Sequence, residues 1–312
     1  MRIAVFGAGA VGSYFGGRLA QAGESVVFIA RGRNLEALRQ NGLRVESISG
    51  DFAVSPAEAT DQPAEAGAAD YVLLGVKAWQ VPEAAEAMRP LIGPATAVLP
   101  LLNGVEAHEQ LAGVLGKQHV LGGLCRILAH QAEPGLVRHT AIEPGLSFGE
   151  WDGHLSERVA SLKNVLDLCV GVKPHIPQNI KTSIWEKFLF IAPFSGIGAL
   201  TRAPAGVLRA LPETRALLEG LMREIAELAQ ARGVSLRADV VQKTMAGIDS
   251  LPPDGTSSMQ RDMLDGKPSE LEAQVGAVVR LAKDSGIVLP LHGVVYACLQ
   301  PSEKRARGEL GY

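Results

Sequence analysis

The sequence has few cysteines, no long apolar run and no concentration of basic charge, and each scarcity excludes a class of protein. The three cysteines, Cys125, Cys169 and Cys298, are far apart, odd in number and without CxxC spacing. This pattern favours reduced thiols in a cytoplasmic protein over a disulfide framework. The seven histidines are also dispersed, so we predict no metal site.

Apolar runs are short throughout the chain. None approaches the length that a helix needs to cross a bilayer. Glycine interrupts the apolar N-terminus after six residues, which is too early for the core of a signal peptide. We therefore expect a cytoplasmic protein with no membrane partner.

Charge is spread evenly over the sequence. The net charge is −3, and the only short basic patch comprises Lys304, Arg305 and Arg307. Nucleic-acid binding needs a concentrated basic face, so we expect no nucleic-acid partner. With 47% apolar residues among 312, the chain can bury a sizeable core and fits two domains of ordinary size.

The first part of the chain alternates apolar runs with helical patterns. Such alternation predicts an α/β fold with a parallel sheet covered on both faces. The strands expected in this sheet are 1–6, 25–30, 71–76 and 95–102, and the helices are 11–23, 33–40, 81–91 and 104–115. Further expected elements are a strand pair at 42–47 and 51–56, strands near 119–129, 135–139, 145–149 and 171–176, and a helix at 154–168.

The pattern changes after Pro174, Pro177 and Asn179. The rest of the chain is mostly helical in pattern, and about 130 residues can support a core of their own. We therefore predict an α/β domain at 1–178 and an all-helical domain at 179–312; the alternative is one α/β domain with a helical tail. The expected helices are 180–192, 213–232, 237–248, 270–284 and 291–300.

A glycine motif, GAGAVG, occupies residues 7–12 between the first strand and the first helix. In this context Gly7 permits a tight turn, Gly9 lets the backbone approach a pyrophosphate, and Gly12 lets helix and strand pack closely. The helix N-terminus can then bind the diphosphate. We predict a Rossmann-type dinucleotide site over Gly7, Ala8, Gly9, Ala10, Val11 and Gly12 rather than a ligand-free turn.

The end of the second strand selects between the two nicotinamide dinucleotides. NAD sites usually carry an acid there, but this sequence reads FIARGR, with Arg31 and Arg33. Guanidinium groups suit a 2′-phosphate, so we predict NADPH as cofactor. The alternative is a pair of solvated loop arginines.

Polar residues follow two neighbouring strands. Lys77 follows YVLLGV, and Asn103 follows AVLPLL. Ligands of open α/β sheets lie beyond the carboxyl ends of the strands, so we predict a ligand role for both, although a solvated lysine and an Asn-Gly turn are the ordinary alternatives.

Five motifs occur in a recognisable order: GAGAVG at 7–12, VKAWQV at 76–81, LLNG at 101–104, WEKF at 185–188 and TSSM…SEL between 256 and 271. In these the sequence resembles the ketopantoate reductase family (2-dehydropantoate 2-reductases) over nearly its whole length. The resemblance implies a Rossmann domain, a helical domain and an active site in the cleft between them. It also implies NADPH-dependent reduction of a 2-oxo acid to the 2-hydroxy acid.

The resemblance assigns roles to individual residues. Lys187 matches the catalytic lysine, Glu270 an acid near the nicotinamide, and Ser258 a serine that contacts substrate. Lys77 and Asn103 match a polar pair near the cofactor, and Asn103 also borders the substrate. For Glu270 the alternative is a helix N-terminus favoured by an acid.

The sequence departs from the family at three substrate positions. Ile191, Ser195 and Ala205 stand where the family places asparagines that bind ketopantoate. Only Ser195 retains a hydrogen-bonding side chain for substrate, and replacing a polar pocket wall with an apolar one changes the preferred substrate.

Three functions follow as hypotheses. The first is reduction of 2-dehydropantoate to pantoate in pantothenate biosynthesis, with Lys187 stabilising the developing oxyanion and donating the proton. The second is reduction of a different, more apolar 2-oxo acid or imine. The third is a non-catalytic NADPH-binding sensor. The helical domain could also support a homodimer.

Overall fold

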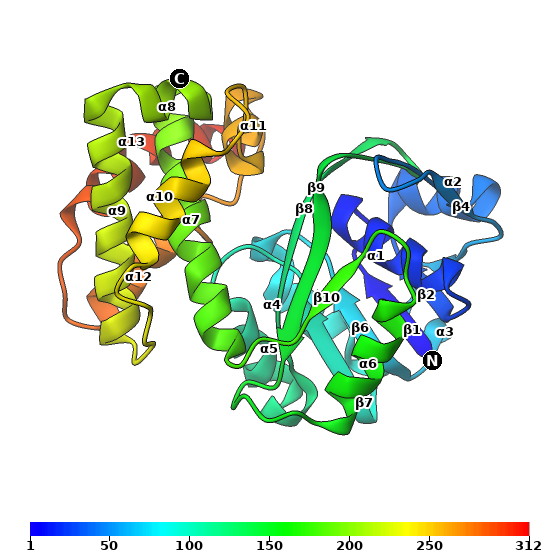
Figure 1. Ribbon diagram of the computed structural model, residues 1–312. Coiled ribbons are helices and arrows are strands. Elements are labelled where there is room, and N and C mark those ends of the chain that lie inside the picture. The colour runs from blue at the N-terminus through cyan, green and yellow to red at the C-terminus, as the bar shows by residue number, and fades with distance from the viewer. Residues whose placement is uncertain (312) are drawn as a thin grey trace. The chain divides into compact units, whose positions relative to one another are not determined.

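The computed structural model describes residues 1–311 and divides into two compact units. The first comprises Met1–Leu102 with Ala107–Ile180, and the second comprises Asn103–Glu106 with the chain from Lys181 onward. The first is a mixed α/β unit and the second is helical, which confirms the predicted fold class (Figure 1).

A parallel sheet forms the centre of the first unit. Its order is β5-β2-β1-β6-β7, and every pair is parallel. Strand β1 lies in the middle, and its Ile3, Ala4 and Val5 are fully buried because both faces of the sheet are covered. The strands are β1 (Arg2–Phe6), β2 (Ser25–Ile29), β5 (Glu58–Thr60), β6 (Ala69–Leu74) and β7 (Ile92–Pro100).

Two apolar layers cover this sheet. On one face, β1 and β6 pack with α3 (Pro63–Ala66), α4 (Val81–Ala87) and α5 (Ala107–Leu115). On the other face, α1 (Ala10–Gln21) lies between the parallel sheet and a second sheet, with α6 (Glu157–Asp167) in the same core. Helix α1 is therefore enclosed on two sides.

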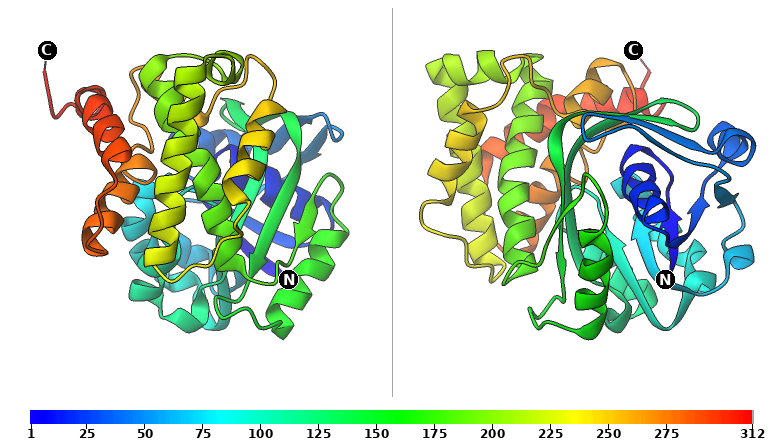
Figure 2. Two further views of the ribbon diagram at one scale, coloured as in Figure 1. Left: turned by 60° about the vertical axis from the view of Figure 1, so that its left-hand side comes forward. Right: turned by 45° about the vertical axis from the view of Figure 1, so that its right-hand side comes forward.

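The second sheet comes from strands that sequence reasoning placed only approximately. Its order is β10-β9-β3-β4, and β8 pairs with β9 as the long green hairpin of Figure 2. Residues 135–139 and 145–149, expected as separate strands, form one continuous strand because β8 pairs along their length. The antiparallel pairing of β3 and β4 agrees with the expected strand pair. The bounds are β3 (Leu43–Ser47), β4 (Phe52–Val54), β8 (Gly122–Glu133), β9 (Leu136–Gly149) and β10 (Lys173–His175).

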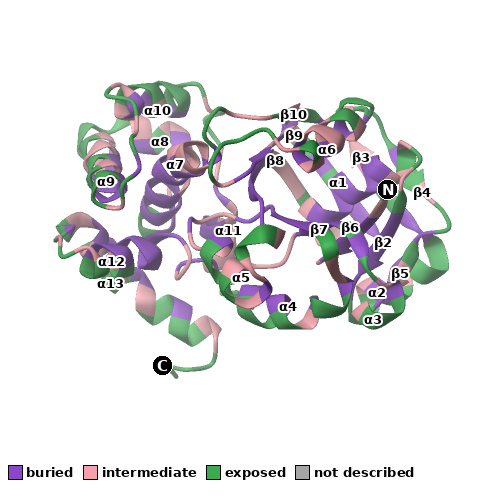
Figure 3. Cartoon of the chain, turned by 90° about the horizontal axis from the view of Figure 1, so that it is seen from below, coloured by how far each residue is buried: buried purple, intermediate pink, exposed green. Residues whose placement is uncertain are grey.

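The second unit is a helical bundle around α7 (Ile180–Thr201). This helix was expected to end before Pro193, but it continues for eight residues beyond it. Residues 192–199 are all buried (Figure 3), and burial of this stretch outweighs the hydrogen bond that proline removes. Gly196 lies against Val275 and Val295, so small residues let α7 approach its neighbours.

Among the remaining helices, α9 packs against α8, α10, α12 and α13. Residues 270–274, expected to be helical, instead form a bend followed by turns, and the helix begins at Val275. None of the helices within residues 1–311 combines the length and apolar character needed to cross a membrane. The bounds are α8 (Ala205–Ala210), α9 (Pro212–Ala231), α10 (Val240–Asp249), α11 (Ser258–Leu264), α12 (Val275–Asp284) and α13 (Pro290–Ala306); α2 of the first unit is Gly32–Asn41.

Candidate active site

The glycine motif forms a tight turn between β1 and α1. Gly7 has φ +97°, and its N–H donates a hydrogen bond to the Ile29 carbonyl at 3.1 Å. A Cβ on Gly12 would lie 2.2 Å from the Gly7 carbonyl oxygen, closer than any side chain tolerates. Packing of the strand against the helix therefore requires both glycines.

Gly9 is not required by packing. It precedes α1 with an ordinary φ of −77°, and a Cβ there would meet nothing nearer than the Gly75 oxygen at 3.9 Å. The first turn of α1 carries no acidic side chain, so its N–H groups face no competing charge. The space beside Gly9 and the helix N-terminus fit the diphosphate of a dinucleotide.

Asn34, on α2, holds the motif in place. Its Nδ2 donates to the Ala8 carbonyl at 2.7 Å, and the Ser13 hydroxyl donates to the same oxygen at 3.0 Å. The Asn34 Oδ1 accepts from Gln131 Nε2 at 2.6 Å and from the Gly135 N–H at 2.9 Å. One amide thus ties the glycine turn to the β8–β9 hairpin. No local sequence signal marks Asn34, because its partners come from elsewhere in the fold.

Arg31 stands at the end of β2, directly before α2. Its guanidinium lies 3.2 Å from Glu83 Oε1, and both side chains are 68% exposed. An exposed pair of this kind contributes at most about 1 kcal/mol, so Arg31 can exchange Glu83 for a phosphate. Arg33 is exposed in the first turn of α2, which has no acid. The arrangement fits a 2′-phosphate.

Lys77 lies close to the glycine turn along the neighbouring strand. A Cβ on Gly75 would be 3.1 Å from both the Gly7 oxygen and the Gly12 nitrogen, so the end of β6 touches the turn. Lys77 follows two residues later and is half-buried; its N–H donates to Gln80 Oε1 at 3.1 Å. Its ammonium lies 5.8 Å from the centre of the Trp79 ring.

Asn103 and Glu270 meet within the helical unit. The Asn103 Nδ2 lies 3.4 Å from Glu270 Oε2, which is long for a hydrogen bond. Glu270 is only 6% exposed, whereas Asn103 is half-buried. Two predicted site residues are therefore brought together although 167 positions separate them.

Helix α7 carries the predicted lysine and two of the substrate positions. Lys187 and Ile191 are half-buried, one helical turn apart. Ser195 is fully buried, and its hydroxyl has no hydrogen-bond partner among residues 1–311. Four-residue spacing places all three on one side of the helix.

The other two predicted substrate positions lie on short helices. Ser258 is the half-buried first residue of α11, whose cap is Ser257. Ala205 is fully buried and opens α8, with its N–H bonded to the Gly255 carbonyl at 2.9 Å.

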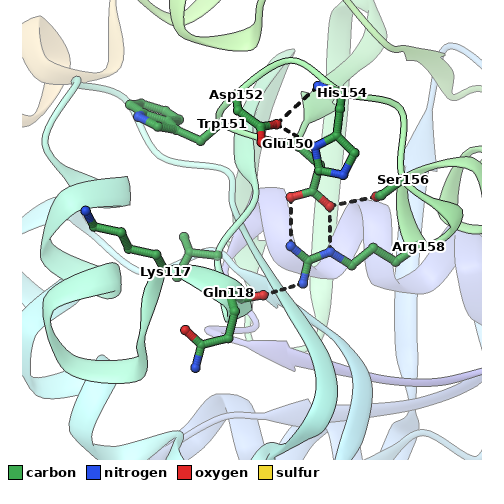
Figure 4. A pocket seen from close by; sticks show the side chains of 9 residues that line it. Lys117, Gln118, Glu150, Trp151, Asp152, His154, Ser156 and Arg158 are labelled. Atoms are coloured by element: carbon green, nitrogen blue, oxygen red, sulfur yellow. Dashed lines mark hydrogen bonds and ion pairs between the residues drawn. The ribbon is translucent and has the colours of Figure 1, made fainter.

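A separate hollow of about 500 Å³ lies in the first unit (Figure 4). Glu150 accepts two hydrogen bonds from Arg158, each 2.7 Å, and one from Ser156 at 2.6 Å. Burial acts to raise the pKa of Glu150, but these hydrogen bonds outweigh it and hold the pKa below its usual range. Glu150 pairs with Arg158 and Asp152 pairs with His154, and no residue that lines this hollow belongs to the predicted site. Within residues 1–311 no cluster of His, Cys, Asp and Glu could hold a metal ion.

Comparison with known proteins identifies the family. The profile of the family described as ketopantoate reductase PanE/ApbA matches residues 3–153, and that of its C-terminal part matches residues 179–303. An uncharacterized oxidoreductase, YkpB, of Bacillus subtilis is 33% identical over 305 residues, covering 97% of this chain and 99% of the relative. A 2-dehydropantoate 2-reductase of Mesorhizobium japonicum is 32% identical, covering 91% and 92%.

Solved structures agree. A PanE/ApbA family ketopantoate reductase from Ralstonia eutropha superposes with a TM-score of 0.89 at 32% identity, covering 98% of this chain and 100% of the other. These matches confirm the resemblance seen in the motifs and the assignment to oxidoreductases. This chain therefore belongs to the ketopantoate reductase PanE/ApbA family of oxidoreductases, whose members include 2-dehydropantoate 2-reductases.

Proposed function

We propose that this protein uses NADPH to reduce a 2-oxo acid to the 2-hydroxy acid, with 2-dehydropantoate as the first candidate substrate. The observation that carries the proposal is the meeting of Asn103 with the buried Glu270 in a chain that also has a diphosphate cradle at Gly9. Cytoplasmic pantothenate biosynthesis is the setting that this substrate implies.

The choice of NADPH rests on charge at the end of β2. Arg31 and Arg33 are exposed there, and no acid stands in the first turn of α2 to bind ribose hydroxyls. A guanidinium that is released from Glu83 can bind a 2′-phosphate with two parallel hydrogen bonds.

We assign to Lys187 the donation of the proton to the substrate. Bound NADPH supplies a hydride to the carbonyl carbon of the substrate. Negative charge then develops on the carbonyl oxygen, and an ammonium placed beside it stabilises that charge and donates the proton. Lys187 is half-buried on a well-packed helix, and partial removal from water strengthens such an interaction.

We assign to Glu270 and Asn103 the role of orienting the cofactor and the substrate. The Asn103 amide donates toward the carboxylate, which leaves the Asn103 carbonyl oxygen as an acceptor. Ser258, half-buried at the start of α11, is assigned a contact with the substrate.

The position of Ile191 favours a second candidate. Ile191 is half-buried one turn after Lys187, where the family has an asparagine, and it offers an apolar surface. A 2-oxo acid with an apolar side chain would lose less on desolvation against isoleucine than the hydroxyl of ketopantoate would. A more apolar 2-oxo acid is therefore the alternative substrate.

The decisive experiment follows NADPH oxidation with a panel of 2-oxo acids that includes ketopantoate. An Ile191→Asn variant should shift kcat/KM toward ketopantoate by about tenfold or more, the scale of one hydrogen bond to a hydroxyl. Absence of turnover with every acid of the panel would contradict the proposal.

Lys187→Ala tests the proton donor. We expect kcat to fall by about 10²- to 10⁴-fold while NADPH affinity stays nearly constant. Lys181→Ala removes another half-buried lysine from the same helix and serves as the matched control. Unchanged turnover in Lys187→Ala would refute the assigned role.

A further inference from the structure

Glu303, on the last helix, is a buried carboxylate with an unusual set of partners. Its side chain is 3% exposed. The N–H of Ser269 donates to both of its oxygens at 3.1 Å, and the Ser269 hydroxyl donates to Oε2 at 2.6 Å. Ser269 directly precedes Glu270, so Glu303 holds the main chain beside a predicted site residue.

Arg307, the C-cap of α13, completes the contact four residues after Glu303. Its Nε donates to Glu303 Oε1 at 2.7 Å, and its Nη2 donates to the Ser269 carbonyl at 3.1 Å. Both polar groups of the Ser269 backbone are thereby bound by the Glu303–Arg307 pair. An ion pair this well satisfied offsets the cost of burying the carboxylate.

Hydrogen bonds also hold the main chain on the C-terminal side of Glu270. The Ser269 oxygen Oγ accepts from the Leu271 N–H at 3.2 Å. The Glu270 carbonyl accepts from the N–H groups of Ala273 and Gln274, at 3.1 and 3.0 Å. Main-chain positions on both sides of Glu270 are therefore fixed by hydrogen bonds, and only its side chain remains to be oriented.

A second group of hydrogen bonds holds the chain segment that carries Asn103. Arg280, on α12, donates to Glu272 Oε2 and to Glu106 Oε2, each at 2.9 Å. Tyr296, on α13, donates its hydroxyl to Glu272 Oε1 at 2.7 Å. The segment that carries Asn103 and the turn that carries Glu270 are thus joined through one arginine.

We propose that Glu303, together with Arg307, is a positioning residue that holds the Ser269 backbone so that the Glu270 carboxylate stays at Asn103. This inference rests on the proposed function of Glu270. A pair of apolar side chains would fill the same volume at little cost in stability, whereas only an acceptor of this shape fixes both the N–H and the hydroxyl of Ser269.

The test is a double-mutant cycle between Glu303→Gln and Glu270→Gln. Glutamine keeps the shape of Glu303 but presents an amide donor where Ser269 or Arg307 needs an acceptor. We expect Glu303→Gln alone to lower kcat/KM by about ten- to hundredfold, the scale of a misplaced site residue. The double variant should be no worse than Glu270→Gln alone.

Glu224→Gln is the matched control. Glu224 is also a buried carboxylate of the helical unit that accepts from main-chain N–H groups of α13, but at Leu291 and His292. It should lower the melting temperature as Glu303→Gln does and leave kcat/KM unchanged. Equal losses of activity in the two variants, or additive losses in the cycle, would overturn the inference.

Two further readouts separate this inference from the proposed function. Amide hydrogen exchange should accelerate at residues 269–271 in Glu303→Gln and not in Glu224→Gln, with no cofactor present. Should the wild-type chain reduce no 2-oxo acid, the proposed function fails, and the same cycle is then read in the dissociation constant of NADPH. Independent effects of the two substitutions on that constant, or unchanged exchange at 269–271, would refute the positioning role.

Ser269→Ala, which removes only the hydroxyl, provides a milder variant if Glu303→Gln does not fold.

Discussion

Asn103 and Glu270 approach to 3.4 Å between amide nitrogen and carboxylate oxygen, although one follows a strand of the parallel sheet in the sequence and the other precedes a helix near the C-terminus. Both belong to the helical unit, because residues 103–106 group with it and not with the sheet that they follow. The Asn103 amide is therefore a donor beside the buried Glu270 carboxylate, and mutation of either residue tests this contact.

Asn103→Asp replaces the donor by a second carboxylate. Repulsion between like charges should displace Glu270, and we expect kcat/KM to fall by about ten- to hundredfold. Asn164→Asp makes the same change on the exposed surface of α6 and should have no effect. Steady-state kinetics of both variants checks the prediction, which fails if they behave alike.

Arg31→Ala tests the choice of cofactor. Loss of a charge-assisted contact to a 2′-phosphate should weaken NADPH binding by about ten- to hundredfold and leave NADH binding nearly unchanged. Glu83→Gln, which removes the carboxylate that pairs with Arg31, should not weaken NADPH binding. Fluorescence titration with both dinucleotides measures the ratio, and an equal loss for NADH would contradict the assignment.

His292 and Glu224 make stability depend on pH. The fully buried His292 has its Nδ1 2.7 Å from Glu224 Oε2. Burial lowers the pKa of His292 and outweighs the carboxylate, which acts to raise it. For Glu224, burial acts to raise the pKa, but hydrogen bonds from His292 and the α13 backbone outweigh it and lower the pKa. The lowered pKa values of His292 and Glu224 together indicate a neutral imidazole that donates a hydrogen bond to an ionised carboxylate.

The sign of the pH effect follows from the lowered pKa values. The unfolded chain takes up a proton on histidine near its ordinary value of 6.5, and the folded chain does so only at lower pH. Stability is therefore fully present above that value and is lost as pH falls, at most by about 1.4 kcal/mol per pH unit for this group. Urea unfolding at about pH 7.5 and about pH 5.5 should show a smaller loss in His292→Asn, whose amide can still donate to Glu224. Equal losses would place the pH dependence elsewhere.

Gln274 and Gln260 form a matched pair for stability. Both are fully buried, but neither side-chain polar atom of Gln274 has a hydrogen-bond partner among residues 1–311. Gln260 Nε2, in contrast, donates to the Ala203 carbonyl at 3.0 Å. Gln274→Leu should raise the free energy of unfolding by about 1 kcal/mol, and Gln260→Leu should lower it by about 1–3 kcal/mol. Urea unfolding of both variants measures these changes, and a lower free energy of unfolding in Gln274→Leu would contradict the prediction.

Local pattern was sufficient for the elements that carry the cofactor half of the site. Short apolar runs predicted four of the five strands of the parallel sheet but missed the short edge strand β5. The glycine spacing predicted the turn that the structure shows at Gly7 and Gly12. Local pattern failed where distant packing decides. Helix α7 passes through Pro193 because its surroundings bury it. Residues 271–274 form turns directly after a segment that is bound to α13 through Ser269.

The sequence by itself determined most strands and helices, the glycine turn, the basic end of β2 and the motifs of the reductase family, since each of these depends on residues that are close in the chain. It missed the short elements β5, α3, α8 and α11. Tertiary structure alone decided which distant side chains meet. Asn34 with Ala8, Asn103 with Glu270, and Glu303 with Ser269 pair across tens to more than a hundred residues. Such contacts leave no periodic trace, because each depends on one polar side chain whose partner lies far away in the chain.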